Sequence, residues 1–278
     1  MRLAISNIAW DVSEDENIAN LLKQHDVDAI DIAPGKYFPD PAKATTEEIV
    51  YVKKWWAERG ISITGMQALL FGTTGLNLFG SQNTQDSMVQ HLSEVCRIAA
   101  GLGATRLVFG SPKNRDRSGL SDEKTIKTAV AFFQRLGDIA QSYGVIICLE
   151  PNPPCYGANF MTTSAETADV VSQVGHAAIR MQLDTGALAI NGEDPSEVLS
   201  NSSNLIGHIH ASEPDLVPLG DGSVNHAAMS NSVLQYLSEH VVSIEMLATK
   251  DESHIASIER ALRVATQFYR NVNNERSL

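Results

Sequence analysis

The stretch VIICLEPNPPCYGANF, residues 145–160, decides how the rest of the chain is interpreted. Its first five residues form an unbroken apolar run, which is typical of a strand buried on both faces of a parallel sheet. Glu150 follows at once, and a loop rich in Pro, Gly and Asn comes next. A carboxylate at the end of a core strand loses hydration, which costs free energy unless a partner compensates. The sequence therefore predicts a polar site where this strand ends.

Seven further runs of β-branched or apolar residues predict strands at residues 3–8, 28–33, 61–66, 105–110, 179–184, 205–210 and 241–246. Amphipathic stretches lie between them, and the clearest predicted helices are residues 87–104, 125–144, 163–175 and 252–272. Strands that alternate with helices indicate parallel β/α units. A (β/α)8 TIM barrel typically has about 250 residues. The sequence thus predicts a single TIM barrel domain over residues 1–278.

An open doubly wound sheet is the alternative fold. That fold usually has a Gly-rich phosphate-binding turn after its first strand. Here the first predicted strand runs into Asn7-Ile-Ala-Trp10, which contains no glycine. The barrel is therefore favoured.

Metal-binding side chains end or nearly end four consecutive predicted strands: Glu150, Asp184, His210 and Glu245. The carboxyl ends of barrel strands form the catalytic rim. Each residue alone has an ordinary explanation, such as a helix cap, a turn or a core histidine. Together, three carboxylates and one imidazole at one rim would repel each other without a cation. The set favours Mn²⁺, Mg²⁺ or Co²⁺, and Zn²⁺ is also compatible.

Four further residues are candidates for contact with a substrate. His208 shares a strand face with His210 one layer deeper, where a hydrogen-bonding role is favoured over a ligand role. Asn7 is a candidate donor to a hydroxyl group, and Trp10 is a candidate stacking surface for a sugar ring, with core packing as its alternative. His226, after the Gly-containing segment 220–225, either approaches the site or caps the following helix.

The loop after the fourth predicted strand carries three cations within five residues: Lys113, Arg115 and Arg117. Arginine forks suit phosphate and carboxylate groups. The loop is therefore a candidate clamp for an anionic substrate, and a solvated surface loop is the alternative.

Composition narrows the class of protein. The formal net charge of -12 argues against a nucleic-acid partner, because neutralising phosphates needs clustered Lys and Arg. The three cysteines form no close metal-type pair, so reduced thiols in a cytoplasm are expected. The N-terminal segment has no signal-peptide pattern, and no apolar run approaches the roughly 20 residues of a membrane span. We expect a cytoplasmic protein with no membrane partner.

Four motifs carry a resemblance to a known family: SNIAW (6–10), DIAPGKYF (31–38), LVFGSPKNR (107–115) and LEPNPPCYG (149–157). With the four strand-end residues, they make the whole chain resemble the xylose-isomerase-like TIM barrels, in particular sugar phosphate isomerase/epimerase proteins. That superfamily includes sugar isomerases and ketose 3-epimerases, and it borders on AP-endonuclease-type enzymes and dehydroshikimate dehydratases.

The resemblance implies roles for the four strand-end residues. Glu150 and Glu245 would be both metal ligands and the acid/base pair, one removing a proton next to a carbonyl and the other returning one. The metal would stabilise the enediolate charge. Asp184 and His210 would be ligands only.

The sequence departs from the ketose 3-epimerase pattern at three positions. Ala187 stands where those enzymes carry a histidine, Leu216 where they carry an arginine, and Tyr156 where they carry a glutamate. These groups help to hold a free ketose. Their absence argues against plain 3-epimerase activity and leaves metal-assisted proton transfer intact.

The leading hypothesis is a metal-dependent isomerase or epimerase acting on a sugar, sugar phosphate or sugar acid. A lyase or dehydratase is the alternative, since the same proton abstraction can expel a leaving group. An AP-endonuclease-type hydrolase and a non-catalytic sugar-binding protein are less favoured, the latter because binding alone does not require two facing bases. The expected partner is a small carbohydrate, and a homo-oligomer is compatible with this view.

Overall fold

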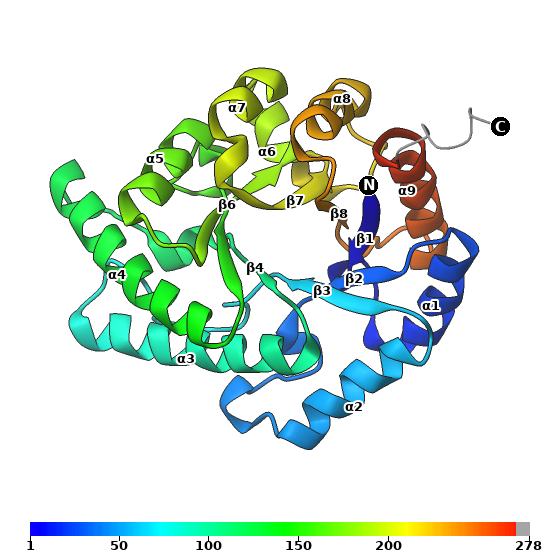
Figure 1. The fold of residues 1–278 in the computed structure, drawn as a ribbon, viewed down its shortest axis with the longest axis horizontal. Helices are drawn as coiled ribbons and strands as arrows, with labels where there is room; N and C mark the ends of the chain where they lie inside the picture. Colours follow the sequence, from blue (N-terminus) through cyan, green and yellow to red (C-terminus); the bar gives the residue numbers. More distant parts are fainter. Residues whose placement is uncertain (271–278) are drawn as a thin grey trace.

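The computed structural model describes residues 1–270, which fold into a closed barrel of eight parallel strands. The strands pair in chain order, and β8 pairs with β1 to complete the ring. Figure 1 shows the strands as an inner ring with the helices around it. The predicted (β/α)8 TIM barrel is confirmed, and the open doubly wound sheet is excluded by the closure.

All eight predicted strands are present, and their ends agree with the predicted ends to within two residues. The strands are β1 Arg2–Ser6, β2 Ala29–Ile32, β3 Ser62–Met66, β4 Arg106–Phe109, β5 Ile146–Leu149, β6 Ile179–Asp184, β7 Ile206–Ser212 and β8 Val241–Glu245. The first strand ends early because residues 7–9 form a 3-10 turn. The seventh is longer than predicted, so His210 lies two residues before its end.

The helices are α1 Asp15–Gln24, α2 Thr46–Ala57, α3 Gln82–Leu102, α4 Asp122–Ser142, α5 Ser164–Val174, α6 Thr185–Asn191, α7 Pro195–Ser202, α8 His226–Leu237 and α9 His254–Tyr269. The four predicted helices correspond to α3, α4, α5 and α9. Residues 271 and 272 of the last prediction lie outside the described residues. Helices α3 and α4 begin earlier than predicted because Ser81 and Ser121 cap their first turns.

Two irregularities in strand pairing set the phase of the inward-facing side chains. The register shifts between Met181 and Gln182, where β6 pairs with β7. This shift places Asp184 opposite His210. A second shift follows Ile30, where β2 pairs with β3. Such bulges re-aim side chains and are over-represented at barrel rims and next to active sites.

Within residues 1–270, no helix combines the length and the apolar character needed to cross a bilayer.

Candidate metal centre

The four strand-end residues meet at one place on the catalytic rim. Glu150 directly follows β5, Asp184 ends β6, His210 lies near the end of β7 and Glu245 ends β8. One candidate ligand atom from each residue lies within 4.8 Å of all the others. The convergence expected from the sequence is therefore present in the fold.

His210 lies at the base of this cluster and is completely buried. Its Nδ1 is 3.1 Å from Glu245 Oε2 and 3.5 Å from Glu150 Oε1. Neither approach is aligned as a hydrogen bond. Within residues 1–270 both imidazole nitrogens and Glu150 Oε1 lack a hydrogen-bond partner. Buried polar atoms almost always have a partner. The unpaired Glu150 Oε1 and one unpaired nitrogen of His210, within a cluster of four ligand atoms, therefore fit the ligand set of a divalent cation.

The cluster also perturbs the ionisation of its members. Burial and the neighbouring Glu245 and Glu150 raise the pKa of Asp184 to about 7. Burial disfavours a charged His210, but the carboxylates of Glu245 and Glu150 outweigh it and raise its pKa. Burial likewise opposes ionisation of Glu245, yet His210 outweighs it and lowers the pKa of that carboxyl. Without a cation, the site therefore retains protons that a cation would displace.

A surrounding set of hydrogen bonds orients the carboxylates. Gln67, just after β3, donates through Nε2 to Glu245 Oε1 at 2.6 Å. Ser212 donates to Asp184 Oδ2 at 2.7 Å, and Asn152 donates to Glu150 Oε2 at 3.2 Å. The sequence interpretation missed all three residues. Gln67 and Ser212 could have been identified from the sequence, because both lie at the ends of strands, as the four candidate ligands do. Their side chains are polar but are not typical metal ligands.

His208 lies one layer below the cluster, as favoured from the sequence. Its Nε2 is 2.7 Å from Asp31 Oδ2, and both side chains are almost completely buried. Asp31 also accepts a hydrogen bond from Thr64 Oγ1 at 3.0 Å. The ring centroids of His208 and His210 are 5.3 Å apart in an edge-to-face arrangement. His208 thus does not line the cavity as a substrate-binding residue, and its partner Asp31 was not anticipated.

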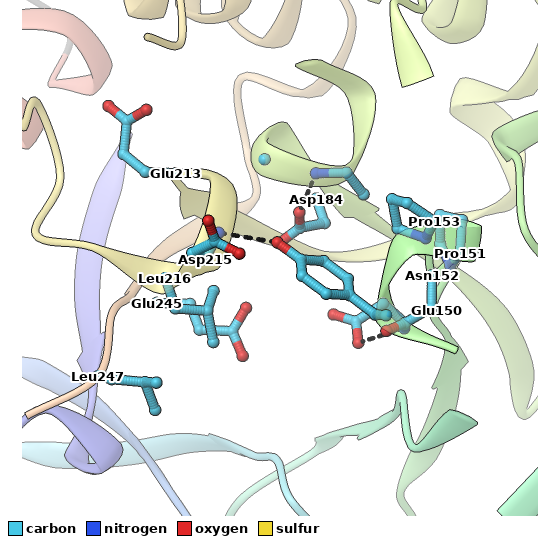
Figure 2. A pocket seen from close by; sticks show the side chains of 13 residues that line it. Glu150, Pro151, Asn152, Pro153, Asp184, Glu213, Asp215, Leu216, Glu245 and Leu247 are labelled. Carbon is cyan, nitrogen blue, oxygen red and sulfur yellow. Dashed lines mark hydrogen bonds between the residues drawn. The ribbon is translucent and has the colours of Figure 1, made fainter. Parts of the chain in front are cut away.

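A cavity of about 360 Å³ opens above the cluster. Figure 2 shows that Glu150 and Glu245 enter it from opposite sides, with Asp184 between them. The residues lining this cavity are Glu150, Pro151, Asn152, Pro153, Tyr156, Asp184, Gly186, Ala187, Glu213, Asp215, Leu216, Glu245 and Leu247. All three positions that depart from the ketose 3-epimerase pattern are among them.

Asn7 and Trp10 do not line this cavity. Trp10 is completely buried, donates from Nε1 to Asp15 Oδ1 at 2.7 Å, and packs edge-on against Trp56. Asn7 is buried too, and its Oδ1 accepts from the backbone N–H of Ala33 at 2.7 Å. Trp10 is therefore a core residue rather than a sugar platform, and Asn7 ties the turn after β1 to the end of β2.

The structure does not bring the three cations of the loop after β4 together in the cavity lining. Arg115 is completely buried and donates from Nη1 to the backbone carbonyl of Glu150 at 2.7 Å, and burial lowers its pKa to about 10. Arg117 pairs with Asp122, and Lys113 is exposed away from the cavity lining. The loop therefore supports the backbone at Glu150 and does not present cations to a substrate.

His226 also lies away from the cavity lining. It is the first residue of α8, and Asn225 provides the cap. Its Nε2 is 2.8 Å from Glu213 Oε1 and its Nδ1 is 2.8 Å from the Tyr269 hydroxyl. Both ring nitrogens are engaged, so His226 fixes Glu213 and is not free to bind a substrate.

Many solved structures share the fold, and three of them show the degree of similarity. D-psicose 3-epimerase from Clostridium cellulolyticum H10, solved with D-tagatose, is 16% identical, with a TM-score of 0.81 over 97% of this chain and 99% of that one. The IolI protein with a zinc atom is 18% identical, with a TM-score of 0.76 over 97% and 98%. The 3-keto-D-glucoside 4-epimerase from E. coli is 16% identical, with a TM-score of 0.77 over 95% and 99%.

Comparison with curated protein sequences gives no match. The model of one family, the xylose isomerase-like TIM barrels, matches residues 19–271. That match spans most of the chain and all of the strands from β2 to β8. The chain therefore belongs to the xylose isomerase-like TIM barrel family.

Proposed function

We propose that this protein is a divalent-metal-dependent isomerase or epimerase of sugars. One observation carries the proposal: three carboxylates and an imidazole converge at the floor of a cavity of about 360 Å³, and Glu150 Oε1 and both His210 nitrogens have no hydrogen-bond partner within residues 1–270. Cavities of this size hold small ligands. The names of two solved structures with this fold, a D-psicose 3-epimerase and a 3-keto-D-glucoside 4-epimerase, support a carbohydrate substrate.

Glu150, Asp184, His210 and Glu245 would hold the cation. Oxygen-rich sets with one nitrogen suit Mn²⁺, Mg²⁺ or Co²⁺, and the zinc in the IolI structure supports Zn²⁺ as well. A bound cation would supply Lewis-acid polarisation of substrate oxygens.

The two glutamates would carry the proton transfer. They face each other across the cavity, so a sugar carbon between them is reachable from both sides (Figure 2). One carboxylate takes a proton from the carbon beside a carbonyl, and the other, in its acid form, delivers a proton to the opposite face. Delivery to the same carbon inverts its configuration. Delivery to the former carbonyl carbon, with transfer of the neighbouring hydroxyl proton to the former carbonyl oxygen, moves the carbonyl.

Residues around the glutamates would hold them in place for this step. Gln67 fixes one oxygen of Glu245, and Asn152 fixes one oxygen of Glu150. Arg115 donates to the backbone carbonyl of Glu150. Positioned bases need this support, because small displacements of a reacting group lower rates strongly.

Cleavage of nucleic-acid phosphodiesters is disfavoured by the same cavity. Its lining includes the acidic residues Glu150, Asp184, Glu213, Asp215 and Glu245. No lysine or arginine is among the described lining residues, so a phosphate backbone would find no basic side chain to bind there.

The test begins with metal content. Elemental analysis of the purified protein, and of chelated protein re-titrated with Mn²⁺, is expected to give about one cation per chain. Keto sugars are then incubated with the loaded protein in D₂O, and products are weighed by mass spectrometry. Solvent deuterium at carbon with otherwise unchanged mass supports isomerase or epimerase chemistry, whereas loss of water or of a leaving group indicates a lyase.

Matched variants assign the roles. Glu150→Gln and Glu245→Gln are each expected to lower turnover by about 10²–10⁴-fold, because each removes a positioned acid/base group. Glu197→Gln, at an exposed glutamate in the first turn of α7, is the control. Near-normal turnover in either active-site variant, or failure of the protein to bind any divalent cation, would overturn the proposal.

A further inference from the structure

The cavity carries a strongly one-sided charge. Five acidic side chains line it, namely Glu150, Asp184, Glu213, Asp215 and Glu245, and no lysine or arginine is among its described lining residues. The Glu213 carboxylate is bound by His226 and by the backbone N–H groups of Gly220 and Val224, which leaves four acidic groups toward the cavity. A divalent cation would balance only two of these four charges. A phosphate or carboxylate on a substrate would therefore lack a basic partner and face net negative charge.

The outer wall of the cavity, in contrast, is apolar. Leu216 and Leu247 lie side by side, since the backbone N–H of Leu247 donates to the carbonyl of Leu216 at 2.9 Å. Leu247 is 51% exposed and lines the cavity, so its side chain is open to contact with a bound molecule. Pro151 and Pro153 lie on the other side of the cavity, beyond Glu150 (Figure 2). An apolar group that enters the cavity would therefore contact apolar side chains on both sides.

The backbone of this wall is held in a costly conformation. Asp215 and Leu216 have φ values of 58° and 53°, a region that non-glycine residues avoid. The hydroxyl of Tyr156, itself in the cavity lining, accepts a hydrogen bond from the backbone N–H of Asp215 at 2.8 Å. Such conformations persist where the surroundings over-determine them, and they cluster at functional sites. The loop after β7 is thus pinned with Leu216 in the cavity wall.

We propose that the cavity selects an uncharged sugar bearing an apolar substituent, such as an alkyl or aryl group in glycosidic linkage. The substituent lies against Leu216 and Leu247, while the sugar carbons reach Glu150 and Glu245. The part of this proposal that places the sugar carbons at Glu150 and Glu245 rests on the function proposed above. The part that places an apolar substituent against Leu216 and Leu247 rests only on the apolar wall of the cavity.

Binding measured by titration calorimetry tests the proposal without turnover. The full chain, supplemented with Mn²⁺, is titrated with phenyl β-D-glucoside, D-glucose, D-glucose 6-phosphate and D-glucuronate. Phenyl glucoside is expected to bind at least about tenfold more tightly than glucose, because the phenyl ring leaves water. The two anionic sugars are expected to bind no more tightly than glucose.

Two variants locate the effect. Leu247→Asn is expected to weaken phenyl glucoside binding by about fivefold and leave glucose binding unchanged, because only the apolar contact is lost. Val50→Asn on α2, where the valine is 52% exposed, is the matched control and is expected to change neither affinity. Asp215→Asn tolerates the positive φ, and it is expected to improve glucose 6-phosphate binding by about tenfold.

The outcomes separate this proposal from the proposed function. It is overturned if an anionic sugar binds more tightly than phenyl glucoside, if Leu247→Asn leaves the preference intact, or if no glucoside binds to protein with metal bound. If the preference holds but no solvent deuterium enters any keto sugar, the specificity stands and the proton-transfer function fails. If deuterium enters sugars without any preference for the substituent, the function stands and this assignment fails.

Discussion

Gly110, directly after β4, shows how closely the chain packs around Glu150. A Cβ atom at this position would lie 1.9 Å from Glu150 Oε2 and 3.0 Å from its Cδ. Asn152 Nδ2 donates to the same carboxylate oxygen at 3.2 Å. The absence of a side chain at residue 110 is therefore what lets the carboxylate occupy its place in the cluster.

We expect Gly110→Ala to impair the site more than the fold. The clash falls on the end of a long side chain, which can move, so the free energy of unfolding should change by no more than about 1 kcal/mol. The displaced carboxylate should weaken Mn²⁺ binding by about 10–100-fold, as loss of a ligand's support does. Calorimetric metal titration and urea unfolding measure the two effects.

Gly35→Ala is the control for this substitution, because a Cβ there meets no atom within 4 Å and no positive φ is involved. It should leave metal affinity unchanged. Unchanged metal affinity in Gly110→Ala would mean that Glu150 tolerates the shift and that its place in the cluster is not specific.

Single residues also show where prediction from sequence succeeds and where it stops. Glu150 and Asp184 could be placed because parallel strands deliver their last residues to one rim. Trp10 and Arg115 could not, because they lie in loops whose course depends on tertiary contacts with Asp15 and with the Glu150 carbonyl. The sequence does not distinguish an arginine whose side chain is exposed in a loop from one whose side chain is buried beneath the loop.

At the level of the strands, the pairing of β2 with β3 brings a second buried pair beneath the candidate metal centre. The register shift after Ile30 changes the phase of β2 at Asp31, whose carboxylate reaches His208 of β7. Burial opposes ionisation of Asp31, but the charge of His208 outweighs it, and the pKa of Asp31 lies below its ordinary value. The alternation of apolar and polar residues carries no sign of such a shift, so this pair could not be predicted.

We expect Asp31→Ala to lower the free energy of unfolding by about 3 kcal/mol or more, because it leaves His208 buried without its partner. Asp28→Ala, three residues earlier, is the control. Asp28 pairs with Arg2 on the surface and is 61% exposed, so its loss should cost about 1 kcal/mol or less. Equilibrium urea unfolding compares the two. Equal losses would show that the buried pair contributes no more than an exposed one.

Across the whole molecule, the fold was more predictable than the substrate pocket. The eight strands and the helices between them are predicted by local sequence patterns. The closed barrel is predicted because eight such β/α units are the number found in a TIM barrel. The pocket wall depends on long-range contacts, such as the Tyr156 hydroxyl bonded to Asp215 and the Leu247 N–H bonded to Leu216. The departures at Tyr156, Ala187 and Leu216 could be located from sequence, but their common position in the cavity could not.

The stability of the whole barrel should respond to pH through the candidate metal centre. The pKa of Asp184 is raised to about 7, so between its ordinary range and about pH 7 the folded protein binds a proton that the unfolded chain does not. The raised pKa of His210 has the same effect on stability at pH values above the ordinary pKa of histidine. Both contributions are present at lower pH and are lost as pH rises through the folded values. The lowered pKa of Glu245 acts only at acid pH.

Metal binding reverses this trend, because a cation must displace the same protons. We expect the increase in Tm on adding saturating Mn²⁺ to be larger at about pH 8 than at about pH 6. The free energy of stabilisation by the metal should grow by up to about 1.4 kcal/mol per pH unit for each proton displaced. Comparing protein with Mn²⁺ against protein with chelator at each pH cancels groups remote from the site, such as His240, whose pKa is lowered by burial. The variant Asp184→Asn should show a smaller pH dependence, since it cannot bind the proton. A metal-induced increase that is equal at both pH values would mean that the cation does not occupy the Asp184–His210 cluster.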